Sequence, residues 1–326
     1  MAYDGKALHA ALDRHKQLVG EHERILTERR RSLHSLIPRL SEISAELSSS
    51  VIACIKLSLE TDTDAEERME QIKLDNLKLQ EERGLILADH GFPPDYLSTT
   101  YRCPKCADSG FIEREMCDCL KALYKEELSR ELSMTMGTTG VDLSSVDLSI
   151  YSDKPYPKIS TSPRDNMRYI LDTCRRFISE FNYSKQNLLF TGASGTGKTH
   201  IAGCVAHEAV GLMKSVVYES ACILFTKFDE ERFRTYNDES KADMRRYSDC
   251  DLLILDDLGQ EAPSPYAVSK LYSLINSRLL TGQHTIVITS LGNDEFKRKY
   301  GMSIASRILN SYTSLYFFGE DLRRGM

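Results

Sequence analysis

A seven-residue apolar repeat runs through the start of the chain. Leucine or valine recurs at every seventh position from residue 12 to residue 47, and charged stretches such as EHERILTERRR lie between these positions. This period is typical of a helix that packs along one side. The companion positions are polar, because His15, His22 and Arg29 stand where a second apolar seam should run, and Pro38 interrupts the repeat. We therefore expect two amphipathic helices that meet near Pro38, not a long two-stranded coiled coil.

A third helical pattern covers about residues 64–89, and Gly91 with Pro93 and Pro94 ends it. Helical periodicity resumes in the run LKALYKEELSRELS, beyond a cluster of cysteines. The segment 134–163 follows, with Gly, Thr, Ser and Pro residues and no sustained period. Such a segment is typical of a connection between two units.

The pattern changes behind this connection. Short apolar runs rich in β-forming residues alternate with helical stretches, which is the signature of a parallel sheet covered by helices. The runs are NLLFTG, SVVYES, DLLILDD, HTIVITS and SLYFFG. We predict a helical front domain at 1–135, a linker at 136–163 and an α/β domain with a parallel sheet at 164–326.

Composition narrows the class of protein. The 326 residues are 41% hydrophobic and 28% charged, as in ordinary globular proteins, and the formal net charge is −6. This acidic balance argues against a surface that holds nucleic acid by charge alone. No apolar run approaches the roughly 18 residues of a membrane span, and the first residues lack the apolar core of a signal peptide. We expect a cytoplasmic protein, in which the nine cysteines are not a disulfide framework.

The clearest chemical motif lies between the run NLLF and the helical run HIAGCVAHEAV. It reads GASGTGKT and fits the pattern G-x-x-x-x-G-K-[ST] of a phosphate-binding loop, or P-loop. Glycines let backbone N–H groups approach phosphate oxygens, and the following helix turns its positive dipole end to the anion. We predict that Lys198 reaches the β- and γ-phosphates of ATP and that the Thr199 hydroxyl binds Mg²⁺. The predicted nucleotide-binding residues are Gly192, Ala193, Ser194, Gly195, Thr196, Gly197, Lys198 and Thr199.

Two carboxylates end the apolar run LLIL, about sixty residues after the P-loop. Side chains at the carboxyl end of a parallel strand face the crevice where ligands bind in open α/β sheets. We therefore expect Asp256 to hold Mg²⁺ through water, and Asp257 to orient or deprotonate an attacking water. Acidic residues also cap strands without such a role, and the preceding P-loop is what favours the catalytic interpretation.

Two further polar side chains each allow two interpretations. Ser290 ends the run HTIVITS, where it would reach the γ-phosphate or the attacking water, or be an ordinary polar strand end. Arg307 lies in the helical run SIASRILN. An arginine supplied to a neighbouring subunit raises phosphoryl-transfer rates by roughly 10³–10⁵ in well-studied GTPases, but an arginine on a helix surface is usually solvated. Spacing alone favours the solvated side chain.

Four cysteines form two close pairs ahead of the α/β pattern. Cys103 and Cys106 are followed after ten residues by Cys117 and Cys119. A redox CxxC motif opens a helix in a thioredoxin-like βαβ setting, and the flanking sequence shows none. Four thiolates in two pairs suit a tetrahedral structural Zn²⁺ site. The second pair is separated by one residue, not by two as in a CxxC pair. A metal cluster or another arrangement of ligands therefore stays open, as do a redox site and thiols without a metal.

These runs together resemble the AAA+ helicase loaders of the DnaC and DnaI type, with the transposition ATPase IstB as a relative. The likeness covers most of the chain and includes SPRDNM, NLLFTGASGTGKTHIA, DLLILDDLGQE, LYSLINSRLLTGQHTIVITS and IASRIL. It implies a P-loop AAA+ ATPase domain without a helical lid domain, since only nineteen residues follow Arg307. It also implies that Arg307 is an arginine finger, that subunits self-associate, and that Arg323 in GEDLRR is a phosphate or interface contact. Two positions depart from the family: Ser290 stands where asparagine is usual, and Ser303 where an arginine commonly precedes the finger helix.

The front domain bears its own likeness to this family. The run FPPDYLSTTYRCPKCADSGFI followed by CDCL is similar to the cysteine segment of some Firmicute-type loader homologues, in which the front domain grips the replicative helicase. IstB-type proteins generally have a shorter front, so this feature favours the loader branch.

The leading hypothesis is ATP-dependent loading of the replicative ring helicase onto single-stranded DNA during replication initiation or restart, with ATP, Mg²⁺ and Zn²⁺ as cofactors. Alternatives are an IstB-like helper of DNA transposition, and an ATP-switched interaction module with negligible turnover, since Asp257 stands where other AAA+ ATPases commonly have glutamate. A small-molecule kinase would need an arginine-rich lid, which the sequence does not show. The run TKFDEERFRTYNDESKADMRRYSD offers cations and aromatics for stacking on DNA bases, but a solvated helix pair fits it equally.

Overall fold

The computed structural model describes residues 4–58, 65–98, 100–136, 142–157, 159–233 and 238–324. The chain divides into two compact units, one of residues 12–120 and the other of residues 121–326 together with residues 1–11. Residues 137–141 and 158 of the predicted linker lie outside the described residues. The domain boundaries drawn from the sequence stay a prediction.

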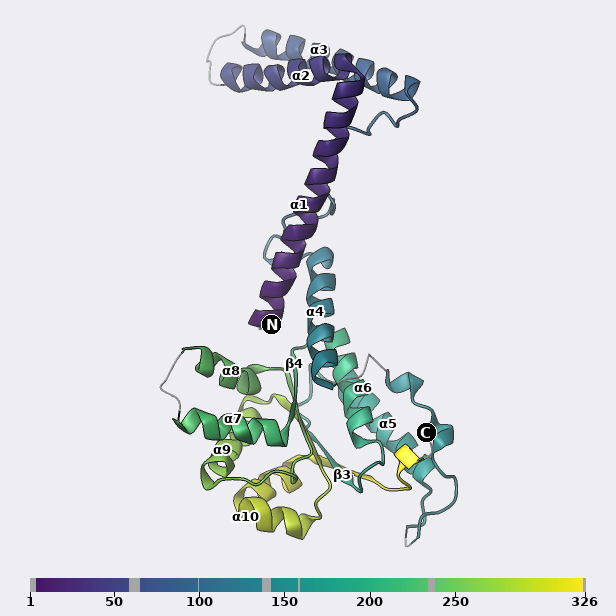
Figure 1. Cartoon of the computed structure of the whole chain (residues 1–326), viewed down its shortest axis with the longest axis vertical. Coiled ribbons are helices and arrows are strands. Elements are labelled where there is room, and N and C mark those ends of the chain that lie inside the picture. The colour runs from purple at the N-terminus through teal and green to yellow at the C-terminus, as the bar shows by residue number, and fades with distance from the viewer. Residues whose placement is uncertain are drawn as a thin grey trace. The chain divides into compact units, whose positions relative to one another are not determined.

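Three long helices precede the cysteines: α1 (Gly5–Leu36), α2 (Pro38–Leu57) and α3 (Ala65–Asp89). Pro38 is the first residue of α2, a position where its missing N–H costs no helical hydrogen bond. The predicted meeting of two helices near Pro38 is therefore confirmed. Helices α2 and α3 lie side by side (Figure 1), and Arg39 of α2 donates hydrogen bonds of 2.7 and 2.9 Å to Glu82 of α3.

The seven-residue repeat supplies the core of this helical unit. Leu33 and Leu40 from the repeat are buried together with Leu87 of α3 and Leu97 of the loop that follows it. Each leucine buried in this way contributes about 1.5–3 kcal/mol. The repeat is thus a packing stripe within one chain, which explains why its second seam need not be apolar.

Short elements join the helical unit to the sheet. An antiparallel hairpin of β1 (Phe111–Ile112) and β2 (Glu115–Met116) lies between the two cysteine pairs. Helix α4 (Asp118–Met136) follows, and two 3₁₀ helices, η1 (Leu143–Ser145) and η2 (Leu148–Ile150), lie within the predicted linker.

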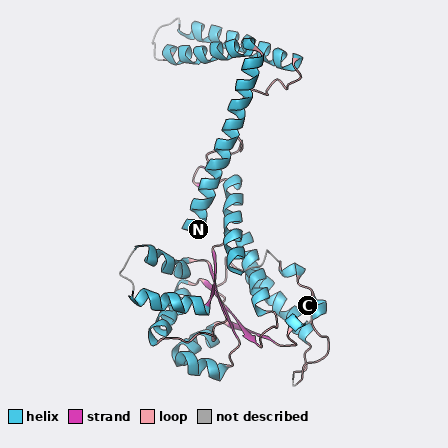
Figure 2. Cartoon of the chain, in the orientation of Figure 1, coloured by secondary structure: helices cyan, strands magenta, loops and turns pink. Residues whose placement is uncertain are grey.

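Five parallel strands, magenta in Figure 2, form the sheet of the second unit. Their order across the sheet is β4, β5, β6, β3, β7. The strands are β3 (Leu188–Gly192), β4 (Val216–Ser220), β5 (Leu252–Asp256), β6 (His284–Thr289) and β7 (Thr313–Phe317). The helices are α5 (Pro163–Ser179), α6 (Lys198–Gly211), α7 (Ala221–Phe233), α8 (Asp238–Asp249), α9 (Pro265–Thr281) and α10 (Asn293–Ser311), and η3 (Leu322–Arg324) follows β7. Every predicted strand is present, and the predicted α/β fold with a parallel sheet is confirmed.

The sheet is buried on both faces. Leu253 and Leu255 of β5 belong to a buried cluster with residues of α7, α9 and α10. Leu252 and Ile254, which alternate with them along the strand, are also fully buried, on the opposite face, and α6 contacts β5. A strand covered on both faces reads as a continuous apolar run, which is why LLIL shows no alternation.

Among the described residues, no helix combines the length and the apolar character that spanning a bilayer requires.

Candidate functional site

The sequence GASGTGKT lies between the end of β3 and the start of α6. Gly192, Gly195 and Gly197 have φ angles of 133°, 80° and 97°, a region that favours glycine. A Cβ atom on Gly192 would lie 1.9 Å from the carbonyl oxygen of Phe317, so a larger residue does not fit there. The loop therefore wraps closely at the N-terminus of α6, an arrangement of backbone N–H groups that binds anions.

Lys198 is the first residue of α6, and only 7% of it is exposed. Its Nζ donates hydrogen bonds of 2.8 and 2.6 Å to the carbonyl oxygens of Gly192 and Ala193. Burial lowers the pKa of this ammonium, and the nearby carboxylates of Asp257 and Asp256 oppose the shift. Lys198 thus places a cation inside the curve of the P-loop.

The P-loop and the end of β5 meet at one carboxylate. Thr199 Oγ1 donates a hydrogen bond of 2.8 Å to Oδ2 of Asp256, and the hydroxyl of Tyr218 donates to the same oxygen. The backbone N–H of Asp257 donates to the other oxygen, Oδ1, at 2.8 Å. Thr199 and Asp256, which the sequence assigned to one Mg²⁺ site, are therefore in direct contact. Tyr218 is a partner that sequence reasoning missed.

Asp257 follows β5 in a left-handed conformation, with a φ angle of 53°. Such a conformation costs a non-glycine residue on the order of 1 kcal/mol or more, and it recurs at functional sites. The next residue is fixed by a hydrogen bond of 2.9 Å from the Leu258 N–H to the carbonyl oxygen of Ile288 in β6. Burial and then the charge of Asp256 raise the pKa of the Asp257 carboxyl, which makes it a stronger base than a free aspartate.

A cavity of about 660 Å³ lies beside the P-loop and is lined on one side by Lys198, Thr199 and Asp257. Its volume is within the range of about 300–1,000 Å³ that small-molecule sites occupy. Residues 145–151 of the predicted linker form another wall, and the Tyr151 hydroxyl would lie 2.7 Å from a Cβ atom on Gly197. Sequence reasoning missed this wall, because an aperiodic segment carries no signal of what it packs against.

The run GEDLRR forms a third wall of this cavity. The Leu322 N–H donates a hydrogen bond of 3.0 Å to the carbonyl oxygen of Gly195. Arg323 donates from Nη2 to Ser194 Oγ at 3.1 Å, and its Nε and Nη2 each lie 3.0 Å from the Asp321 carboxylate. Arg323 therefore contacts the P-loop of its own chain, in the part of the site where phosphates would bind.

The sequence around the P-loop is similar to that of a known protein family. Residues 171–310 match the family model described as IstB-like ATP binding protein. This stretch is similar to that family over 140 of the 326 residues and is named the IstB-like domain for that similarity. Its P-loop and parallel strands confirm the predicted P-loop α/β fold.

Curated relatives of the chain are named as replicative helicase loaders. The replicative helicase loader DnaC of Buchnera aphidicola subsp. Schizaphis graminum is 21% identical over 188 residues, which are 58% of this chain and 74% of the relative. The DnaC of Escherichia coli strain K12 is 23% identical over 154 residues, 47% of this chain and 62% of the relative. A crystal structure of DnaI aligns over 60% of this chain and 93% of its own, at 20% identity and a TM-score of 0.45.

Two predicted residues of the IstB-like domain lie apart from the P-loop contacts. Ser290 follows β6 and accepts a hydrogen bond of 3.3 Å from the Gln260 side chain. Arg307 lies on α10, where its Nε donates a hydrogen bond of 2.9 Å to Asn276 Oδ1 and its guanidinium stacks 4.4 Å from the ring centroid of Tyr272. Among the described residues, neither Ser290 nor Arg307 lines the cavity beside the P-loop.

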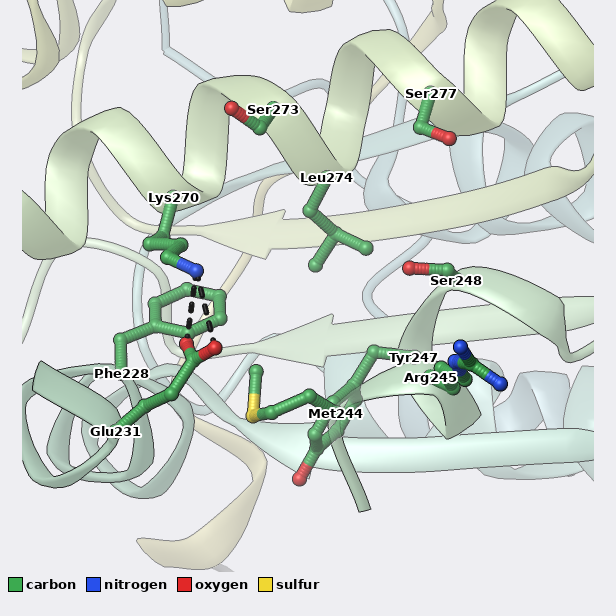
Figure 3. Close-up of a pocket in the computed structure, with 10 residues that line it drawn as sticks. All are labelled: Phe228, Glu231, Met244, Arg245, Tyr247, Ser248, Lys270, Ser273, Leu274 and Ser277. Carbon is green, nitrogen blue, oxygen red and sulfur yellow. Dashed lines mark hydrogen bonds and ion pairs between the residues drawn. The ribbon is translucent and has the colours of Figure 1, made fainter. Parts of the chain in front are cut away.

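A second cavity in the IstB-like domain, of about 310 Å³, lies between α7, α8 and α9 (Figure 3). Figure 3 shows the ion pair of Lys270 with Glu231, at 3.0 Å, across one end of it. Phe228 is buried here and so is not available to stack on a base.

This region contains the run that offered cations and aromatics for DNA. Lys227 donates a hydrogen bond of 2.8 Å to Glu219, and the guanidinium of Arg232 lies 5.9 Å from the ring centroid of Tyr266. The candidates Arg234 and Tyr236 lie outside the described residues.

The four clustered cysteines lie outside the IstB-like domain, in the unit of residues 12–120. Their Sγ atoms all lie within 4.8 Å of one another. The Cys103 and Cys117 sulfurs are 3.7 Å apart, and those of Cys106 and Cys119 are 3.6 Å apart. These distances are far beyond a disulfide bond, whereas four thiolates about 2.3 Å from a tetrahedral Zn²⁺ ion lie about 3.8 Å apart. The donor set therefore fits zinc.

The backbone around this cluster is shaped for thiolates. Asp108, at a φ angle of 61°, accepts a hydrogen bond of 2.7 Å from the Cys103 N–H. A hydrogen bond from the backbone N–H of Cys106 lowers the pKa of the Cys103 thiol to about 7. Burial raises the pKa of the Cys119 thiol, so this thiol needs a cation or a hydrogen-bond donor before it ionises.

Proposed function

We propose that this protein is an ATPase that loads the replicative ring helicase onto single-stranded DNA in the cytoplasm, during replication initiation or restart. The observation that carries the proposal is the contact between Thr199 of the P-loop and Asp256 of β5, beside a cavity of about 660 Å³. The IstB-like match and the DnaC relatives support the class of function.

The chemistry follows from the residues at this cavity. Thr199 and Asp256 would hold Mg²⁺, which offsets the charge of the phosphates when it is bound. The P-loop N–H groups and Lys198 bind the phosphates. Asp257 orients the attacking water and accepts its proton, a role that its raised pKa favours. Ser290 assists at the tip of β6 by a hydrogen bond to that water.

Self-association completes the proposed site. Arg307 lies away from its own cavity, and a finger supplied to a neighbouring subunit needs that placement. Two contacts fix the direction of the Arg307 guanidinium: it stacks on the ring face of Tyr272, and its Nε donates a hydrogen bond to Asn276. Arg323 serves the same subunit's phosphates from the Ser194 side of the loop.

The front of the chain, residues 1–135, is proposed to bind the helicase, with residues 136–163 as linker and residues 164–326 as the ATPase domain. Zn²⁺ on Cys103, Cys106, Cys117 and Cys119 would give this front its shape, because a structural zinc supplies on the order of 10 kcal/mol of folding energy.

A helicase-loading assay tests this function. Full-length protein is mixed with the purified ring helicase of the source organism and circular single-stranded DNA that carries an annealed oligonucleotide. We expect ATP and the protein together to raise displacement of the oligonucleotide, since the helicase must be placed on a circle without ends. Unchanged displacement would contradict the proposal. Stimulation of a transposase instead would support the alternative of an IstB-like transposition helper.

Metal analysis tests the zinc site separately. We expect about one zinc per chain in the purified protein. We also expect a lower melting temperature after chelation, because the loop around Gly110 then loses the metal ion that holds its two cysteine pairs together. Cys106→Ser is expected to lose the metal, whereas Cys54→Ser, outside the cluster, keeps it. A metal-free wild type whose four clustered thiols titrate freely would refute the site.

A further inference from the structure

The polar companion positions of the seven-residue repeat all contact the segment that carries the cysteines. His22 Nε2 lies 2.9 Å from the carbonyl oxygen of Thr100, and the Arg29 guanidinium lies 5.0 Å from the ring centroid of Tyr96. His15 Nε2 lies 3.8 Å from the Sγ atom of the last cysteine of the cluster. The seam that was too polar for a coiled coil is therefore the side of α1 on which residues 96–119 dock.

His15 is the member of this seam that contacts the metal-binding thiols. Only 5% of its surface is exposed, and Cys119 is half-buried. Its Cε1 would lie 3.5 Å from a Cβ atom on Gly110, so the turn between the cysteine pairs closes directly over the ring. A buried imidazole needs hydrogen-bond partners, and the sulfur of Cys119 is within reach of Nε2.

The direction of this hydrogen bond follows from the chemistry of a zinc thiolate. A cysteine that binds zinc has lost its proton, so its sulfur can only accept. The proton between His15 and Cys119 must then belong to Nε2. Four thiolates around Zn²⁺ carry a net charge of about −2, and N–H donors that reach the sulfurs offset the cost of burying that charge.

We propose that His15 is a positioning residue of the zinc site, whose Nε2–H donates to Cys119 Sγ and fixes the metal-bound loop on α1. This inference rests on the proposed zinc site and adds to it a partner from a distant part of the sequence. Outer partners of this kind typically change metal affinity by about 10–100-fold when removed.

Zinc release under a chelator challenge measures the effect in the full-length protein. His15→Leu replaces the imidazole by an apolar side chain of similar bulk and so removes the hydrogen-bond donor. We therefore expect zinc to leave at least about 10-fold faster. His15→Gln keeps an N–H group at the reach of Nε2 and is expected to restore most of the retention. His22→Leu is the matched control, on the same seam but without a sulfur contact, and should release zinc as the wild type does. Wild-type retention in His15→Leu would overturn the proposal.

Two measurements on the wild type keep the proposal testable if His15→Leu does not fold. Nitrogen-15 NMR of the histidines reports the tautomer, and a His15 ring without a proton on Nε2 would overturn it. The absorption spectrum of the cobalt-substituted protein reports the ligands, and we expect four sulfurs. A spectrum of three sulfurs and one nitrogen would make His15 a ligand and overturn the outer role. A wild type without zinc would instead refute the proposed zinc site itself.

Discussion

Lys198→Ala is expected to weaken ATP binding by roughly 100-fold or more, to the point where binding is no longer detected at ordinary concentrations. A charge-assisted hydrogen bond contributes about 1.5–3 kcal/mol, and two such bonds to phosphates are within reach of one ammonium. The Lys198 ammonium already lies inside the loop, 2.8 and 2.6 Å from two carbonyl oxygens, so no rearrangement of the backbone is needed to present it. Calorimetric titration with ATP measures the loss.

Lys297→Ala is the matched control for this experiment. Lys297 is a partly exposed lysine of α10 that pairs with Asp294 at 3.6 Å, and it does not line the cavity beside the P-loop in the described part of the chain. Its variant should bind ATP as the wild type does. If Lys198→Ala melts like the wild type and still binds ATP with unchanged affinity, the P-loop assignment is wrong.

Arg307→Ala is expected to leave ATP binding intact and to remove the part of ATP turnover that depends on assembly. An arginine finger raises the rate of phosphoryl transfer by roughly 10³–10⁵ in well-studied GTPases. The loss of ATP turnover should therefore be large at protein concentrations that favour self-association. The reason lies in geometry: Tyr272 and Asn276 hold the guanidinium away from its own cavity. Phosphate release measured over a range of protein concentrations shows the effect, with Arg298→Ala on the same helix as control.

Mixing the two variants separates a finger in trans from a local defect. An Arg307→Ala subunit keeps an intact P-loop, and a Lys198→Ala subunit keeps an intact finger. Each variant alone lacks the turnover that depends on assembly, but a mixed assembly contains sites with both groups, so this turnover should partly recover. No recovery, although the mixture co-assembles by light scattering, would exclude Arg307 as a group supplied to a neighbour.

The sequence predicted those parts of the molecule that depend on local pattern. Continuous apolar runs became strands, and the rule that parallel strands end at one edge placed Thr199 near Asp256. Tyr218 escaped prediction because its contact with Asp256 depends on β4 lying beside β5, which periodicity does not encode. His15 escaped as well, since its contact spans more than a hundred residues of chain. The roles of Arg307 and Arg323 rest on resemblance, and that of Ser290 rests on its place at the end of a strand, where the family usually has asparagine; all three stay predictions.

The wall formed by residues 145–151 decides how this protein can be truncated. A chain that begins at residue 164, the predicted start of the ATPase domain, would keep the whole sheet and the P-loop, yet lose Ile150 and Tyr151 from the cavity. It would also lose the hydrogen bond of 3.1 Å from the Leu143 N–H to Glu208 of α6. A shortened protein made for nucleotide binding or crystallisation should therefore begin upstream of Leu143, because a correct fold would not ensure a complete pocket.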